Sequence, residues 1–453
     1  MELDEFYSYS QIQASHWPTV HFITQKNLAT KNDKLRFVTL TIASDFGAFS
    51  TRCVFPSGEE FQVPPGLPHI LEHVLLRMSH NTIREIKRKT GGRVGGAITE
   101  DKLLLYCELF MTSRAQQADF ITGVLNLLLK IFFDKQDIKD IREAFKSEQQ
   151  RIKNELYIGS KETLEKALRQ ALFHTDTIHY GAGGDHECFD SLTENEVSLG
   201  RLISNKNIAS IVIHTYNEFE EDVFERVTKV IDYWFPLYTP KVFILGPEEP
   251  HNIRTEWAPI PWAGGKEAFG LYGIKLRPLP DISKGRPDLI SKACLQFFLQ
   301  EKERLNKEES GVDSFGSNMN KAVITTPFTG KASRYIRAYT LMFPIDNPVT
   351  FLDTWERRRM KNSCRNKMIE VLEEQKIYLP RDIKFFLYYL LNSRHGLTRL
   401  CLHGDTYGVD LTSMLEEYQQ GMDRTLIDCL IAEIYNSTEQ DAIAFETVVF
   451  QNR

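Results

Sequence analysis

A proline-rich stretch divides the sequence into two halves, and this division most constrains the fold. Six prolines fall between residues 236 and 261, and two adjacent glycines follow. Proline lacks a backbone N–H and biases the preceding residue away from helix, so the stretch is typical of an interdomain connector. The chain has 453 residues, and single hydrophobic cores stop growing at about 250–300 residues. We therefore expect a first domain over 1–238, a linker over 239–264 and a second domain over 265–453.

Both halves contain strand-like and helix-like segments. Runs rich in β-branched and aromatic residues predict strands, and apolar residues at helical spacing predict helices. In the first half the predicted strands are 36–44, 102–110 and 207–216, and the predicted helices are 118–133, 136–156 and 220–235. In the second half the predicted strands are 268–276 and 333–343, and the predicted helices are 288–305, 348–376, 381–393 and 411–434, with a glycine stop inside 391–400. This order predicts an α+β fold of two related domains, each an antiparallel sheet backed by helices.

Composition excludes several classes of partner. The formal net charge is −6, and no basic stripe points to nucleic acid or to an anionic membrane surface. The N-terminus lacks the basic and apolar regions of a signal peptide, and no apolar run reaches the ~18 residues of a membrane span. The seven cysteines are scattered and odd in number, which favours reduced thiols. We therefore expect a soluble cytoplasmic protein.

The segment PPGLPHILEHVLL, residues 64–76, places two histidines and a glutamate within five residues. Proline is favoured in the first turn of a helix, so we expect a helix to begin near Pro68. On that helix His69 and His73 share one face, and neutral imidazoles at this separation can bind one Zn²⁺. Glu72 lies beside them, where it can take a proton from water. This H-x-x-E-H string is the inverted form of the H-E-x-x-H motif; the alternative is two histidines on the rim of a core helix.

A catalytic zinc site needs a third protein ligand. The text PPGLPHILEH resembles the active-site segment of the pitrilysin/insulinase (inverzincin) metallopeptidases, whose third ligand is a glutamate about 75 residues further on. Here Glu148 stands 148 − 73 = 75 positions after His73, and Glu155 is the alternative. The resemblance favours Glu148, because Glu155 would require an insertion of two helical turns. The family usually has another glutamate seven residues before the ligand, where this sequence has Ile141. For both glutamates the competing interpretation is a solvated helix face.

A second segment, GGRVGGAITEDKLLLYCEL over 91–109, resembles the family's edge strand and hairpin. In relatives that strand pairs with the substrate backbone, in the manner of strand addition. The resemblance implies substrate contacts from five residues, which are Gly95, Gly96, Ala97, Ile98 and Thr99. The family usually has Asn-Ala-aromatic-Thr where this sequence has Gly-Ala-Ile-Thr, so one side-chain contact is missing. A plain glycine-rich turn before a strand is the alternative.

A third segment, 174–197, resembles a stretch that supports the first domain in relatives, and we interpret its three histidines as structural. The second half departs further from the family. Relatives of this size form a chamber from two related halves, and the half facing the zinc supplies an arginine and a tyrosine that stabilise the oxyanion. At the corresponding places this sequence has Glu308 and Phe315, and neither side chain can donate the hydrogen bonds required.

The resemblance therefore implies a zinc-dependent metalloendopeptidase that hydrolyses unstructured peptides. The half-size chain, the lack of a targeting signal and the divergent second half add the expectation of a leader or precursor peptide as substrate. It implies Zn²⁺ as the cofactor and Glu72 as general base, which passes its proton to the leaving amine. Because the arginine and tyrosine are missing, it also implies that the chain is the catalytic half of a heterodimer whose homologous second subunit supplies them. The alternative is a non-catalytic subunit that binds peptides or acts as a scaffold.

Overall fold

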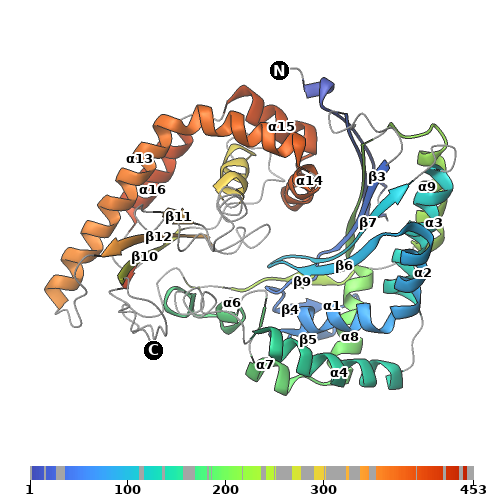
Figure 1. The fold of residues 1–453 in the computed structure, drawn as a ribbon. Helices are drawn as coiled ribbons and strands as arrows, with labels where there is room; N and C mark the ends of the chain where they lie inside the picture. Colours follow the sequence, from blue (N-terminus) through green and yellow to red (C-terminus); the bar gives the residue numbers. More distant parts are fainter. Residues whose placement is uncertain are drawn as a thin grey trace. The chain divides into compact units, whose positions relative to one another are not determined.

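The computed structural model divides the chain into two compact units (Figure 1). Unit 1 consists of Met1–Tyr157, Tyr180–Gly246 and Tyr389–Asp405, and unit 2 consists of Ile158–His179, Pro247–Tyr388 and Thr406–Arg453. The structure describes residues 3–14, 17–26, 36–111, 117–134, 138–156, 169–180, 183–184, 186–216, 218–235, 241–248, 250, 268–276, 290–299, 301, 323–325, 337–345, 354–393, 395–421, 425–437 and 442–445. Unit 1 thus includes a segment from late in the sequence.

Unit 1 is built on a six-stranded sheet with the order β1-β2-β8-β3-β7-β6. The strands are β1 (Tyr7–Ile12), β2 (Thr19–Gln25), β3 (Arg36–Ser44), β6 (Arg93–Ile98), β7 (Leu103–Met111) and β8 (Ile208–Thr215). In the middle of the sheet, Leu40 of β3 lies opposite Cys107 of β7 and Ile213 of β8. All neighbouring strands are antiparallel except β2 and β8. The expected α+β class is confirmed, but this one parallel pair departs from a purely antiparallel sheet.

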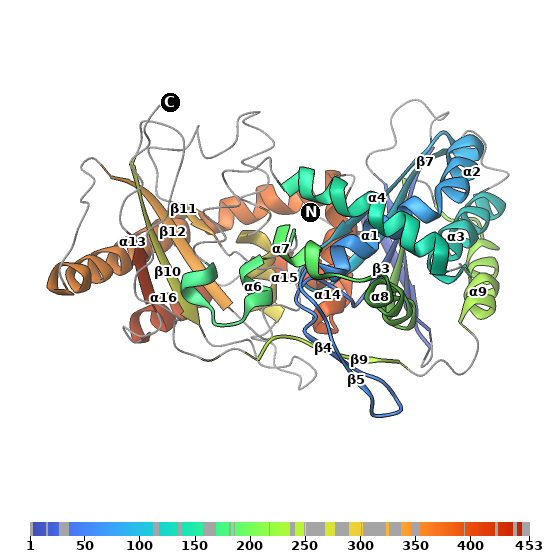
Figure 2. The same ribbon diagram turned by 90° about the horizontal axis from the view of Figure 1, so that it is seen from below.

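Helices of unit 1 cover one face of this sheet, and α14 lies on the other face (Figure 2). The helices are α1 (Leu67–Met78), α2 (His80–Thr90), α3 (Gln117–Phe133), α4 (Ile138–Leu156), α7 (His186–Ser191), α8 (Glu194–Lys206), α9 (Val223–Trp234) and α14 (Gly396–Tyr407). Leu40 and Leu105 of the sheet share one buried core with Leu71 of α1 and Leu125 of α3. Fully burying one such side chain contributes about 1.5–3 kcal/mol, so this core fixes α1 against the sheet.

A smaller antiparallel sheet has the order β5-β4-β9. Its strands are β4 (Arg52–Val54), β5 (Glu60–Gln62) and β9 (Phe243–Leu245), and a short 3-10 helix, η1 (Leu3–Glu5), precedes β1. β9 falls within the predicted linker, of which the structure describes only residues 241–248 and 250. This part of the expected connector is therefore a strand of unit 1.

Helix α14 contacts the sheet through buried polar groups. Nε2 of His21 lies 2.8 Å from Oδ2 of Asp405, and Ser210 donates a hydrogen bond to the same oxygen. Nδ1 of His214 lies 3.1 Å from Oγ1 of Thr398, and its Nε2 lies 3.1 Å from Oε1 of Gln25. Buried polar groups are costly unless they are hydrogen-bonded. This set of bonds therefore requires α14 to dock in one register.

The segment that leads into α14 corrects one sequence prediction. A glycine stop was expected inside 391–400, but α13 (Thr354–Asn392) ends at Asn392 and Gly396 is the first residue of α14. A Cβ on Gly396 would lie 2.9 Å from the Leu390 carbonyl oxygen. The glycine is therefore needed for a close turn between two helices.

Unit 2 has a four-stranded antiparallel sheet with the order β11-β12-β10-β13. Its strands are β10 (Ala268–Leu276), β11 (Val323–Thr325), β12 (Arg337–Ile345) and β13 (Ala442–Phe445), and its helices include α13, α15 (Leu411–Gln420) and α16 (Thr425–Asn436). The short α6 (Asp176–Tyr180) and a helical stretch over 290–299 are also present. In its core Tyr418 donates to the Cys294 carbonyl at 2.6 Å, and its ring packs edge-on against Phe386.

The longest helix is α13, which the sequence predicted as two helices separated near Pro380. The 39-residue helix continues through this proline. Apolar residues on both sides of the proline, Leu372, Leu379, Ile383 and Leu387, are buried, so packing overrides the local cost of proline inside a helix. Among the described residues, no helix is both long and apolar enough to cross a membrane.

Acidification is expected to destabilise the chain through His214. Burial, together with the nearby charge of His395, lowers the pKa of His214 to about 3. An unfolded histidine has a pKa of about 6.5, so between these values the unfolded chain binds one more proton than the folded chain. The stabilising contribution is therefore complete above about pH 6.5 and is lost as pH falls, by about 2 kcal/mol at pH 5.

Urea unfolding of the wild type and of His214→Gln between pH 7.5 and 5 measures this effect. Glutamine keeps a donor and an acceptor for Thr398 and Gln25 but does not titrate, so the variant should lose about 2 kcal/mol less on acidification. The same substitution at His80, an exposed residue at the start of α2, controls for the loss of a histidine as such. An identical pH dependence in wild type and His214→Gln would contradict the assignment.

Candidate metal centre

The candidate site begins where α1 begins. Gly66 caps the helix with a left-handed φ of 81°, and Leu67 and Pro68 form the first positions of the helix. A Cβ on Gly66 would come within 3.1 Å of the Phe189 ring, so both the backbone angle and the space require glycine. The predicted start of this helix near Pro68 is thus confirmed. Its apolar face is buried in the core, which leaves the face with His69, Glu72 and His73 for the site.

The two histidines are held by hydrogen bonds to their Nδ1 atoms. His69 Nδ1 donates to the Gly183 carbonyl at 2.8 Å, and His73 Nδ1 lies 3.2 Å from Oε2 of Glu148. The ring centroids are 5.0 Å apart. A proton on Nδ1 leaves the lone pair on Nε2, which is the form of imidazole that binds a metal. Both rings are therefore oriented by groups on the side away from Nε2.

The two candidate glutamates of α4 occupy different places. One carboxylate oxygen of Glu155 and one ring nitrogen from each of His69 and His73 all lie within 4.8 Å of one another. Oε2 of Glu155 is 3.5 Å from Nε2 of His73. Glu148 is only 2% exposed, and its Oε2 contacts the Nδ1 side of the same ring. The geometry thus favours Glu155 over Glu148, the reverse of the preference from sequence.

The same family pattern contains a signal that would have pointed to Glu155. The resembling family usually has a second glutamate seven residues before the ligand. Counting from Glu155, 155 − 148 = 7, so Glu148 fills that position. Counting from Glu148 leads instead to Ile141, a buried apolar residue. The apparent departure from the pattern disappears when Glu155 is counted as the ligand.

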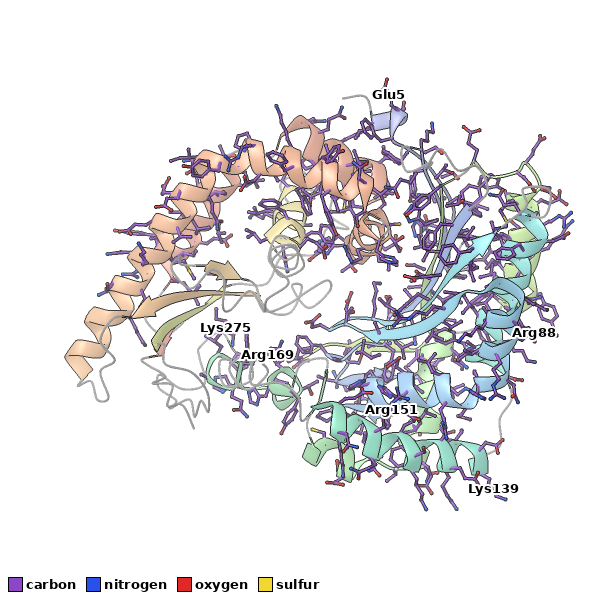
Figure 3. All side chains as sticks on the ribbon, in the orientation of Figure 1. Glu5, Arg88, Lys139, Arg151, Arg169 and Lys275 are labelled. Atoms are coloured by element: carbon purple, nitrogen blue, oxygen red, sulfur yellow. The ribbon has the colours of Figure 1, made fainter. Side chains whose placement is uncertain are left out.

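Two arginines accompany these carboxylates. Arg151 Nε lies 3.3 Å from Oε1 of Glu155, and its Nη1 lies 3.6 Å from Oε2 of Glu148. Arg77 Nε is 3.9 Å from Oε1 of Glu148. Both arginine side chains are more than half exposed, and Arg151 extends from α4 beside α1 (Figure 3). Glu155 therefore has one oxygen beside Arg151 and the other facing the histidines.

Burial perturbs the pKa of two groups in the site. It lowers the pKa of His69, while the hydrogen bond with Gly183 acts in the opposite direction. It raises the pKa of Glu72, and the charges of Glu155 and Glu148 add to this rise while His73 opposes it. His69 is therefore neutral at neutral pH, as a metal ligand must be. A carboxyl with a raised pKa is suited to accepting and returning a proton.

Strand β6 lies directly against Glu72. It is the last strand in the sheet order, so one of its edges faces no strand of the described residues. A Cβ on Gly96 would be 2.2 Å from Oε1 of Glu72 and 2.6 Å from its Cγ. Gly95, Ala97 and Ile98 continue the strand and are half-buried. Residues 95–98 therefore lie in a strand at the edge of the described sheet, and their contact with a substrate stays a prediction.

Thr99 lies beyond that strand, in the turn to β7. Its Oγ1 donates to Oδ1 of Asp101 at 2.9 Å, and its N–H donates to the Lys102 carbonyl at 2.9 Å.

Of the three histidines that the third segment was expected to use structurally, His179 is buried, and its Nε2 lies 2.7 Å from the Phe173 carbonyl oxygen. Glu308 and Phe315 lie outside the described residues. Within the described residues, His69, His73 and Glu155 are the one group of three or more potential metal-binding side chains.

Comparison with known proteins identifies the fold. No protein-family model and no curated protein matches the sequence. The structure is similar to an M16-like peptidase from Alicyclobacillus acidocaldarius, with a TM-score of 0.67 at 14% identity over 98% of this chain and 99% of that chain. It is also similar to a peptidase M16 inactive domain from Pseudomonas fluorescens, with a TM-score of 0.59 at 11% identity over 98% and 99% of the two chains.

The third similar structure is pitrilysin, with a TM-score of 0.59 at 10% identity. This match covers 97% of the present chain and 44% of pitrilysin. At such low identities the likeness shows the fold alone. The chain therefore has the fold of M16-type peptidases, as the sequence resemblance implied, and one of the similar structures is a domain described as inactive. Any chemistry must be argued from the site.

Gly96→Ala is expected to lower the free energy of unfolding by about 1–3 kcal/mol, because the added carbon collides with the buried Glu72 side chain. Urea unfolding of Gly96→Ala, of Glu72→Ala and of the double variant forms a cycle that measures the coupling between the two residues. In the Glu72→Ala background the colliding atoms are gone, so the cost of Gly96→Ala should largely disappear.

Gly123→Ala in α3 is the matched control. Nothing lies within 4 Å of a Cβ at this position, and alanine favours helix, so the variant should be neutral or more stable by up to about 1 kcal/mol. Additive effects of Gly96→Ala and Glu72→Ala would show that the two residues do not press on each other.

Proposed function

We propose that the chain is a zinc-dependent metalloendopeptidase in which His69, His73 and Glu155 hold the metal. The observation that carries the proposal is the convergence of two oriented imidazoles and one carboxylate within 4.8 Å. Two nitrogen ligands and one oxygen ligand, with a position left open, suit catalytic zinc. Glu148 is assigned a supporting role, since a carboxylate on the far nitrogen of a metal-binding histidine fixes its orientation and raises its basicity.

Zinc, when bound, would supply Lewis-acid chemistry that polarises the scissile carbonyl and makes water more acidic. Glu72 is assigned as the general base. Its Oε2 lies 3.5 Å from Nε2 of His73, on the side of the ring that faces the other two ligands. It would take a proton from the attacking water and return it to the leaving amine. Burial, which raises its pKa, supports this exchange.

Strand β6 is proposed to hold the substrate. An extended peptide would add to its open edge through main-chain hydrogen bonds, and the contact of Gly96 with Glu72 sets that edge next to the base. Such binding requires a chain without its own secondary structure, so the substrate class is unstructured peptides, with leader or precursor peptides as a specific case. Residues Gly95–Ile98 would contribute through their backbone rather than their side chains.

We also propose that a homologous second subunit completes the site. The motive is the sequence itself, in which Glu308 and Phe315 stand where the resembling family has an arginine and a tyrosine. In the described residues around His69 and His73, Arg77 and Arg151 pair with carboxylates of the site. Neither is therefore assigned the missing role. The chain would then be the catalytic half of a heterodimer.

A non-catalytic subunit that binds peptides or acts as a scaffold is the second candidate. The similar inactive domain from Pseudomonas fluorescens shows that this fold also occurs without activity. Against it stands the arrangement of two buried carboxylates, Glu72 and Glu148, around two partly buried histidines. Charged groups are costly to bury even when they are paired, and a scaffold needs none of them.

Zinc affinity distinguishes the roles of the two α4 glutamates. Competition with a fluorescent chelator should show one zinc per chain, and Glu155→Gln should weaken its binding more than about 100-fold because a direct ligand is lost. Glu148→Gln removes only a supporting hydrogen bond and should cost about 10–100-fold. Glu143→Gln, at an exposed position of the same helix, is the control and should change nothing.

Equal zinc affinity in Glu155→Gln and wild type, with binding lost in Glu148→Gln, would restore Glu148 as the ligand. The metal site would be contradicted if the wild-type chain bound no zinc at concentrations at which a zinc-binding control peptide does bind it.

Cleavage of a mixture of unstructured peptides, followed by mass spectrometry, tests the base. Glu72→Gln should retain zinc and lose about 10²–10⁴-fold in rate, since glutamine cannot accept the proton. A chelator should abolish the same activity. Glu85→Gln, an exposed glutamate on α2 paired with Lys89, is the matched control.

The wild-type outcome also separates the candidates. Cleavage by the isolated chain would make the second subunit unnecessary. A zinc-loaded chain that cleaves nothing alone but gains activity with a co-expressed homologous subunit would support the heterodimer. A zinc-loaded chain that stays inactive in both settings would favour the scaffold.

A further inference from the structure

Helix α13 carries a stripe of large apolar side chains that face solvent. Ile377 is 65% exposed, Tyr378 51%, Phe385 67% and Tyr388 59%. Single exposed apolar residues are ordinary, but several together on one element mark an interaction surface. The buried face of the same helix, which includes Leu379, already accounts for its packing within unit 2.

Four charged residues lie on the same exposed face, two on each side of Ile377. Glu370, Glu373, Ile377, Arg381 and Lys384 are spaced by three, four, four and three positions. This spacing keeps them on one side of a helix, and all five are exposed. The N-terminal half of the stripe is therefore acidic and the C-terminal half is basic, with an apolar residue between them.

The two halves are symmetric about Ile377. Glu373 and Arg381 each lie four residues from it, since 377 − 373 = 4 and 381 − 377 = 4. Glu370 and Lys384 each lie seven residues from it, since 377 − 370 = 7 and 384 − 377 = 7. A second helix laid antiparallel across the first, with a two-fold axis at Ile377, would place each acid opposite a base.

We propose that this stripe binds a second copy of the same chain, with the two α13 helices packed antiparallel about Ile377. Ile377 contacts its own counterpart, Glu373 pairs with Arg381 of the other copy, and Glu370 pairs with Lys384. An isologous contact of this kind requires a self-complementary surface. A reversal of charge centred on one apolar residue meets that requirement, whereas an unrelated partner would not call for such symmetry.

The contacts that these residues make within the chain do not compete strongly with this pairing. Glu370 lies 3.1 Å from Lys367, and Glu373 lies 4.0 Å from Lys376. Nη2 of Arg381 lies 3.4 Å from Oδ1 of Asp382, and its guanidinium lies 5.0 Å from the centre of the Tyr378 ring. All are contacts between neighbours on one helix, and exposed ion pairs of this kind contribute little.

Pro380 limits the size of the interface. A proline inside a helix bends it away from the proline side, and Pro380 is exposed, so we expect the outer face to be convex. Two convex helices touch mainly at their crossing point. The contact is therefore centred on Ile377, Glu373 and Arg381. We expect a weak dimer that dissociates further as salt screens the ion pairs.

This inference is independent of the metal centre. The stripe belongs to unit 2, whereas His69, His73 and Glu155 belong to unit 1. The dimer does not supply the oxyanion-stabilising subunit and does not exclude it. Its test needs no activity measurement.

The test uses two full-length variants of opposite sign. Glu370→Lys/Glu373→Lys makes the whole stripe basic, and Arg381→Glu/Lys384→Glu makes it entirely acidic. Sedimentation velocity over a concentration series should show a monomer–dimer equilibrium for the wild type. Each variant alone should dimerise at least about tenfold more weakly, because like charges now oppose each other. An equimolar mixture should restore a dimer containing one copy of each variant.

Native mass spectrometry identifies the mixed dimer, because the two variants differ in mass. Glu221→Lys/Glu225→Lys, at exposed positions in unit 1, changes the net charge as much as the basic variant does and should dimerise like the wild type. Three results would each overturn the proposal: a wild type that stays monomeric at high concentration, variants that dimerise as well as the wild type, or a mixture that forms no mixed dimer.

Discussion

Burial of the apolar face of α1 is the constraint on which the site depends. Leu67, Ile70, Leu71, Val74 and Leu75 enter the core of unit 1, and together they leave the helix no freedom to rotate. A helix has only one other face, and the sequence places His69, Glu72 and His73 on it. Hydrophobic burial thus orients three polar side chains that contribute nothing to that burial. Fixing the helix that carries them costs conformational entropy, and burial of its apolar face already offsets this cost.

The electrostatics of the site follow from the same packing. Three carboxylates, those of Glu72, Glu148 and Glu155, lie around two histidines, and without compensation they would repel one another. Arg77 and Arg151 lie beside Glu148 and Glu155, while Oε2 of Glu72 lies 3.5 Å from Nε2 of His73. Burial raises the pKa of Glu72, and the charges of His73 and Arg151 oppose this rise. The carboxyl assigned to proton transfer is thus one whose pKa is raised by its burial in the core.

Sequence alone predicted the elements formed by neighbouring residues better than the contacts between distant ones. The start of α1, the central strand β3 and helix α4 follow from local pattern. The choice between Glu148 and Glu155 does not, because residues seven apart on a helix differ by only about 20° around its axis. Which of them meets the histidines depends on how far α4 has slid along α1, and packing between distant segments decides that. The parallel pairing of β2 with β8 and the docking of α14 escaped prediction for the same reason.

The buried hydrogen bonds between α14 and the sheet show how long-range contacts can fix the position of a helix. Apolar contact alone would tolerate sliding of one helix over a sheet, since dispersion has little directionality. His214 on the sheet hydrogen-bonds Thr398 of α14, and His21 on the sheet hydrogen-bonds Asp405 of α14. A shift of α14 by one turn would break both of these bonds in a buried setting. A segment from residue 389 onward is thereby tied to the sheet that carries the site. The position of that segment on the sheet thus depends on a contact between residues 184 positions apart, His214 and Thr398.

The contact of β6 with Glu72 brings these constraints together. One edge of the strand faces no other strand of the described residues, and Gly96 lets its backbone approach the Glu72 carboxylate more closely than any side chain would allow. In the resembling family an asparagine usually stands here, and it would contribute a side-chain contact to the substrate. Glycine lacks that side chain and lets the strand lie close to Glu72, the proposed base. A peptide added to this edge as proposed would be recognised through backbone hydrogen bonds, which are indifferent to its side chains. Any selectivity among peptides would then come from other parts of the binding surface.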